Sequence, residues 1–190
     1  MNIAVLTQEG KVYCRPDTTW ERENKDLFVP DRVGSYLFAP VVFVRVCKAG
    51  KCIGAKFADR YYDCVNFGAL LYVGDEMDGS AESLACASCH DHSSILPFPL
   101  FSKFTLDKSD NEFTFEKDGR TVFRTEVGTG MRGIIENALV RTSEVVSLRI
   151  GDYVAIELDK AGQLVCRDEK KVLLSGTFCE NSTFDFNVIF

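Results

Sequence analysis

The densest group of side chains that could do chemistry lies between Cys86 and His92. The run from Cys86 to His90 reads C-x-x-C-H, the attachment pattern of c-type haem, and His92 adds a second imidazole. Haem attachment follows export, and no export signal is visible. Zn²⁺ accepts thiolates and imidazoles, but four ligands within seven residues would strain a tetrahedron unless two chains shared the site. The sequence favours a polar loop with partly buried cysteines and no metal, and zinc on Cys86, Cys89, His90 and His92 stays an alternative.

The same stretch contains the weak catalytic candidates His90 and Asp91, beside Ser93 and Ser94. A Cys–His pair or a Ser–His–Asp arrangement would activate a nucleophile. Neighbours along a chain seldom face one another in the geometry that such chemistry needs, so we do not assign a catalytic residue here.

A short acidic cluster, which includes Asp75 and Glu76, follows a predicted buried strand. Its carboxylates could bind a hard cation such as Mg²⁺, which prefers oxygen ligands. The surrounding Gly, Asp and Ser residues favour a solvated turn instead. A relocated cation site on Asp75 and Glu76 is therefore an alternative.

Strand patterns dominate the elements that would position these residues. Asp118-Gly119 between two alternating runs predicts a hairpin, and apolar residues at helical spacing predict helices at 55–64 and 131–146. We expect a mostly β, α+β fold in one domain over residues 1–190, with two helices packed on the sheets. The predicted strands are 41–47, 66–73, 113–117, 120–123, 152–158, 163–166, 171–174 and 184–190.

Two segments resemble the fumarylacetoacetate hydrolase family. The stretch 42–51, followed by 55–63, is similar to an aliphatic strand ending in Arg-Ile-Cys and then Phe-Ala-x-Arg-Tyr-Tyr-Asp. The stretch 118–152 is similar to that family's hairpin, helix and T-L-x-x-G-D turn, and Arg15-Pro16-Asp17 resembles Lys-Pro-Asp. The resemblance implies the mixed β-sandwich roll of the family's C-terminal domain. It also implies a homodimer, a divalent cation, usually Mg²⁺, and chemistry on 2-oxo or 2,4-dioxo acids.

The residues that the resemblance assigns to this chemistry are replaced. Ala39 and Val41 stand where the family has a Glu-x-Glu metal-binding pair, and Leu70 stands at the aspartate ligand. The family lysine falls near Ser88, and Asp91 corresponds to a family aspartate. At the place of the family's Thr-Gly-Thr-Pro substrate loop, residues 156–159 are Ile-Glu-Leu-Asp. The family's catalytic histidine would precede Cys14, but the thirteen residues before Cys14 contain no histidine. Apolar side chains cannot coordinate a cation, so we expect no metal cofactor.

Composition restricts the compartment and the partners. The chain has 22 Lys and Arg against 28 Asp and Glu, with no dense basic run that would indicate nucleic-acid binding. No apolar run is long enough for a membrane span, so we expect a cytoplasmic protein. In that reducing compartment most of the eight cysteines are expected to be buried thiols.

We therefore predict a catalytically degenerate fumarylacetoacetate hydrolase-like protein that acts as a binding or structural subunit, with a possible pocket for a small organic acid. The first alternative is an enzyme on a 2-oxo or 2,4-dioxo acid with a rebuilt site around Asp75, Glu76, His90 and Asp91. The second is a small zinc protein. A homodimer is expected from the resemblance and from 15 Phe and 6 Tyr, which supply apolar surface.

Overall fold

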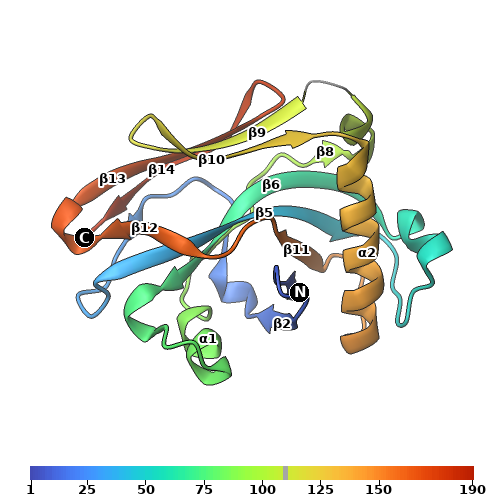
Figure 1. Ribbon diagram of the computed structural model, residues 1–190, viewed down its shortest axis with the longest axis horizontal. Helices are drawn as coiled ribbons and strands as arrows, with labels where there is room; N and C mark the ends of the chain where they lie inside the picture. The colour runs from blue at the N-terminus through green and yellow to red at the C-terminus, as the bar shows by residue number, and fades with distance from the viewer. Residues whose placement is uncertain (109–110) are drawn as a thin grey trace.

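Two curled mixed β-sheets face each other in the computed structural model, which describes residues 1–108 and 111–190 (Figure 1). In these residues the larger sheet has the strand order β2-β1-β11-β5-β6-β7-β3, with β12 paired to β5 and β8 to β6. The strands are β1 (Ile3–Leu6), β2 (Val12–Arg15), β3 (Trp20–Glu21), β5 (Ser35–Val46), β6 (Tyr62–Val73), β7 (Ser94–Ile95), β8 (Phe101–Ser102), β11 (Tyr153–Glu157) and β12 (Gly162–Cys166).

The smaller sheet has the order β10-β9-β13-β14-β4 and lies over β5 and β6 in Figure 1. The hairpin between β9 and β10 turns at Asp118 and Gly119, as predicted. Both residues have positive φ, 48° and 72°, which a two-residue hairpin turn requires and which Asp and Gly tolerate. The strands are β4 (Leu27–Phe28), β9 (Asn111–Lys117), β10 (Arg120–Val127), β13 (Lys171–Phe178) and β14 (Asn181–Ile189).

Strands β5 and β6 form the centre of the larger sheet. Each has twelve residues, and they pair antiparallel from Tyr36–Val73 to Val46–Tyr62. Their apolar residues are buried on both faces of the sheet, and the smaller sheet covers one of these faces (Figure 1). The predicted strands at 41–47 and 66–73 are thus confirmed and are longer than predicted.

The predicted helix at 131–146 is confirmed as α2 (Thr129–Val145), which buries Met131, Ile135, Ala138 and Leu139. The sequence analysis missed α1 (Ala81–Ala87), a short helix that begins after Ser80, whose hydroxyl accepts the Ser83 N–H. No helix of the described residues is both long enough and apolar enough to cross a membrane. Short 3₁₀ helices complete the described elements: η1 (Asp17–Thr19), η2 (Ala55–Arg60), η3 (Gly74–Glu76), η4 (Lys103–Asp107) and η5 (Arg167–Glu169).

The predicted helix at 55–64 is wrong beyond Arg60. Residues Ala55–Arg60 form the 3₁₀ helix η2, and β6 begins at Tyr62. The reason is cross-strand pairing: Tyr62 and Cys64 pair with Val46 and Arg45 on β5. Ladder hydrogen bonds to a neighbouring strand outweigh a weak helical spacing of apolar residues.

The cysteine interpretation is also wrong. All eight cysteines are free thiols, and none is fully buried. The half-buried thiols lie at or near the ends of β5, β6, β12 and β13. The exposed thiols lie in β2, in α1 and in loops. Exposed thiols are Cys14, Cys52, Cys86 and Cys89; half-buried thiols are Cys47, Cys64, Cys166 and Cys179.

Aromatic rings join the two sheets. Phe67 of β6 stacks on Phe113 of β9 with ring centroids 4.9 Å apart and contacts Phe178 of β13 at 4.7 Å. Phe38 of β5 contacts Phe115 in the same layer at 4.9 Å. Together these rings fill the core between the sheets, and the predicted mostly β fold class is confirmed.

Phe67→Ala should lower the free energy of unfolding by about 3–5 kcal/mol, since it leaves a cavity beside two other buried rings. Phe28→Ala is the matched control, because Phe28 is 73% exposed, and it should change stability by less than about 0.5 kcal/mol. Denaturant unfolding of both variants checks this. Equal losses in the two variants would contradict the assigned core.

Candidate functional site

The positions that the resemblance assigns to metal ligands lie side by side on β5 and β6. Ala39 pairs directly with Leu70, and Val41 is the next residue along β5 on the same face of the sheet. All three side chains are fully buried. They bring methyl groups and no oxygen to the place where a hard cation would need carboxylates. These residues do not fit a divalent cation.

A polar cluster begins two residues further along β6, on the same sheet face as Leu70. The Tyr72 hydroxyl donates a 2.5 Å hydrogen bond to Glu157 Oε1, at the end of β11. Tyr13 of β2 is 2.7 Å from Tyr72, hydroxyl to hydroxyl. Glu157 lies within residues 156–159, which the sequence resemblance aligns with the family's substrate loop. The apolar centre thus has a hydrogen-bonded carboxyl beside it.

Arg15 extends this cluster into the interior. Its side chain is buried, its Nε donates a long 3.4 Å hydrogen bond to the Tyr13 hydroxyl, and its guanidinium lies 4.5 Å above the Tyr72 ring. The other guanidinium nitrogens donate to Ser93 Oγ and Ser94 Oγ and to backbone carbonyls. Among the ion pairs of the described residues none involves Arg15. The two tyrosines therefore link this cation to Glu157.

Burial controls the ionisation of the cluster. It raises the pKa of Glu157 above its ordinary value, against the hydrogen bond from Tyr72, which lowers it. Burial also holds the pKa of Tyr72 well above the ordinary phenol range. Tyr72 is thus a neutral donor at physiological pH, and burial weakens the preference of Glu157 for its ionised form. Both residues line a cavity of about 310 Å³.

The sequence analysis did not assemble this cluster. In the sequence, Arg15 was noted only because Arg15-Pro16-Asp17 resembles a family motif, and Glu157 only because it lies in residues 156–159. The available signal was the alternation of β2, which places Tyr13 and Arg15 on one side of a strand. Tyr72 and Glu157 lie 85 residues apart, so only the register of β5 with its neighbours brings them together.

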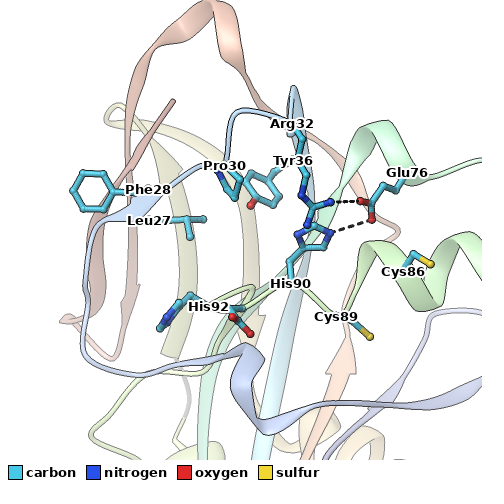
Figure 2. A pocket seen from close by; sticks show the side chains of 11 residues that line it. Leu27, Phe28, Pro30, Arg32, Tyr36, Glu76, Cys86, Cys89, His90 and His92 are labelled. Atoms are coloured by element: carbon cyan, nitrogen blue, oxygen red, sulfur yellow. Dashed lines mark hydrogen bonds and ion pairs between the residues drawn. The ribbon is translucent and has the colours of Figure 1, made fainter.

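A second cavity, of about 470 Å³, contains most of the side chains that the sequence singled out. Figure 2 shows Glu76 between Arg32 and His90: its carboxylate is 3.1 Å from Arg32 Nη1 and 3.0 Å from His90 Nε2. The His90 side chain is only 11% exposed. A half-buried carboxylate therefore orients this imidazole. The lining comprises Leu27, Phe28, Pro30, Arg32, Tyr36, Glu76, Cys86, Cys89, His90, Asp91 and His92.

The remaining candidates serve separate contacts. His92 Nδ1 pairs with Glu21 at 2.9 Å, so the two imidazoles bind different carboxylates. Asp75 accepts the backbone N–H groups of Gly34 and Ser35, which makes it a turn-stabilising residue. Asp91 is exposed. No Ser–His–Asp arrangement forms among these residues, because the Ser93 and Ser94 hydroxyls hydrogen-bond to Arg15, and Ser93 also donates to a backbone carbonyl.

The C-x-x-C-H run lies at the end of α1 rather than in a loop alone. Cys86 is in the last turn of the helix and Cys89 follows it, and both thiols are exposed. Within residues 1–108 and 111–190, no three His, Cys, Asp or Glu side chains are placed to hold a metal ion. The arrangement therefore gives no support to the zinc alternative.

Glu157→Gln should gain stability relative to wild type as pH rises from about 4 to about 8. A carboxyl whose pKa is raised by folding holds its proton more tightly in the folded state. The folded protein thus loses stability as pH rises from the ordinary glutamate value, about 4.3, through the raised one. Melting temperatures across this range check the sign. Glu144→Gln on the surface of α2 is the matched control, and a pH-independent difference at Glu157 would contradict the assignment.

Comparison with known proteins supports the fold. No family model and no curated protein matches the sequence. A protein described as a fumarylacetoacetate hydrolase family member from Yersinia pestis CO92 superposes with a TM-score of 0.80 at 13% identity, over 99% of this chain and 92% of that one.

Two further solved structures have the same fold. Fumarylpyruvate hydrolase from Pseudomonas aeruginosa, in complex with Mn²⁺ and pyruvate, gives a TM-score of 0.80 at 14% identity over 100% of this chain and 90% of that one. A 5-carboxymethyl-2-hydroxymuconate delta-isomerase from Mycobacterium smegmatis gives 0.77 at 17% identity, over 99% and 78%. This chain therefore has the fold of fumarylacetoacetate hydrolase family proteins, as the resemblance in its sequence implied.

Proposed function

We propose that this protein descends from the fumarylacetoacetate hydrolase family and binds a small organic acid without the family's divalent cation, as a binding or structural subunit. One observation carries the proposal: Ala39, Val41 and Leu70, which the resemblance aligns with the family's metal ligands, form a buried apolar group. A divalent cation among methyl groups would lose its hydration and gain no ligand, at a prohibitive cost in free energy.

The organic acid is supported by the surroundings of this group. The P. aeruginosa structure with the same fold holds pyruvate together with Mn²⁺. In this chain the cavity beside Glu157 is lined by Lys11 and Lys160, whose positive charge suits a carboxylate, and by Met77 and Leu84, which suit an apolar body. A small carboxylic acid matches both kinds of lining residue.

A second candidate is an enzyme with a rebuilt site, a hydrolase, lyase or tautomerase on a 2-oxo or 2,4-dioxo acid. The favouring observation is the Arg32–Glu76–His90 chain in a cavity of about 470 Å³. An imidazole oriented by a carboxylate is a competent general acid or base. Asp91 lines the same cavity and could assist His90.

Millimolar Mg²⁺ or Mn²⁺ should leave the melting temperature of the wild-type protein unchanged. A cation at 100 times its dissociation constant would instead add about 2.7 kcal/mol. Differential scanning fluorimetry after treatment with a chelator makes the measurement, and calcium serves as a control for general ionic effects. Clear stabilisation by Mg²⁺ would overturn the proposal. Oxaloacetate turnover that His90→Gln abolishes would favour the second candidate over the first.

We further propose that the protein acts as a cytoplasmic homodimer. Large apolar side chains remain exposed, which is consistent with a covered face in an assembly. Light scattering at micromolar concentration should give twice the chain mass of 21.3 kDa. A value near the single-chain mass would count against the dimer. The most exposed of these side chains are Phe28, Phe104, Val145 and Ile150.

A further inference from the structure

The lining of the cavity beside Glu157 contains both charged and apolar side chains. Its charged residues are Glu9, Lys11, Glu157 and Lys160, and its apolar residues include Met77 and Leu84. Lys11 is paired with Glu9 at 3.2 Å. Among the ion pairs formed by residues 1–108 and 111–190, none uses the Lys160 ammonium, which leaves this charge for a ligand.

Glu157 forms the polar end of the cavity. Tyr72 donates to its Oε1 at 2.5 Å, and the Gln8 backbone N–H donates to its Oε2 at 3.2 Å. Each oxygen has a second lone pair, so the carboxyl can still accept from a ligand or, once protonated, donate to one. The same carboxyl is largely withdrawn from water, which weakens its preference for the ionised form.

The charged groups around Glu157 act in opposite directions. The nearby Glu9 carboxylate raises the pKa of Glu157, and the Arg15 guanidinium lowers it. The hydrogen bond that the Tyr72 hydroxyl donates to the carboxyl also lowers the pKa of Glu157. Among titratable and charged groups, Tyr72, Arg15 and Glu9 act on the carboxyl itself, Tyr13 is hydrogen-bonded to Tyr72, and Lys11 and Lys160 line the same cavity.

We propose that this cavity binds a small organic anion with an apolar body, and that Glu157 takes up one proton when the anion binds. The inference rests on the proposed function, because it gives the organic acid a site and a pH dependence. The proton comes from solvent, one O–H bond forms on the Glu157 carboxyl, and no other bond changes. The neutral carboxyl then donates a hydrogen bond to the anion.

Electrostatics gives the reason for the coupling. An ionised Glu157 would repel the carboxylate of a bound ligand, and this repulsion is stronger in a partly buried site than in bulk water. Protonation of the Glu157 carboxyl, whose burial already disfavours the ionised form, removes this repulsion. A ligand amine would have the opposite effect, because it would stabilise ionised Glu157 and release a proton. The sign of the pH dependence therefore distinguishes an anion from a cation.

Butyrate is the probe, and NMR chemical-shift titration at about pH 6 and about pH 8 gives its dissociation constant. Wild type should bind butyrate more tightly at the lower pH, by up to tenfold per pH unit for one proton. Glu157→Gln, which mimics the neutral carboxyl, should show no pH dependence. At about pH 8 the variant should bind butyrate more tightly than wild type does.

Two controls complete the test. Lys160→Ala should weaken butyrate binding by up to about fivefold and keep its pH dependence. Butylamine, which has the same carbon chain and the opposite charge, should bind more weakly than butyrate. Dispersed amide spectra establish that each variant is folded.

Four results would overturn the inference. The first is weaker butyrate binding by Glu157→Gln at about pH 8, and the second is wild-type binding that does not change with pH. The third is a preference for butylamine. If butyrate binds but perturbs only resonances of the cavity at His90, the inference fails while organic-acid binding stands. The proposed function fails separately, through stabilisation by Mg²⁺ or Mn²⁺.

Discussion

The pairing of β5 with β6 is the constraint on which both the core and the candidate site depend. One face of this pair carries Phe38 and Phe67 into the aromatic layer between the sheets. The opposite face carries Ala39 beside Leu70, and then Tyr72. A shift of one residue would exchange the two faces and place a phenol in the aromatic core. The register therefore fixes the apolar centre and the polar cluster together.

Burial of the Arg15 charge is the second constraint. An unpaired buried cation would cost several kcal/mol, yet Arg15 has no ion-pair partner among the described residues. Its compensation is spread over two serine hydroxyls, backbone carbonyls, the face of the Tyr72 ring and a path through Tyr13 and Tyr72 to Glu157. Hydrogen bonds in such a chain polarise one another, so the protonation state of Glu157 changes the electrostatic environment of the Arg15 guanidinium. The polar cluster thus behaves as one electrostatic unit.

Long periodic segments were predictable from sequence, and contacts between distant segments were not. The β-branched run in β5 predicts a strand and the apolar spacing in α2 predicts a helix, because each segment is long enough for its pattern to be recognised in the sequence. Tyr62 and Cys64 were assigned to a helix because their pairing with β5 is invisible in the local sequence. The same limit hid the polar cluster: Tyr13 and Tyr72 lie 59 residues apart, and Tyr72 and Glu157 lie 85 apart. The assignment of Ala39, Val41 and Leu70 to the family's ligand positions rests on the resemblance alone, because no local pattern marks such positions.

Because the apolar centre offers a cation no ligand, the negative charge of a bound organic acid would have to be neutralised in another way. A divalent cation would neutralise a ligand carboxylate directly, whereas Ala39, Val41 and Leu70 offer it nothing. In the proposed complex the ligand charge must then be balanced by Lys11 and Lys160, which line the cavity, and by Arg15, which is linked to Glu157 through the Tyr13 and Tyr72 hydroxyls. Glu157 opposes this balance while it is ionised and assists it once protonated. A proton can therefore take over the neutralising part of the cation's role, although it cannot polarise a carbonyl as strongly as a metal ion does.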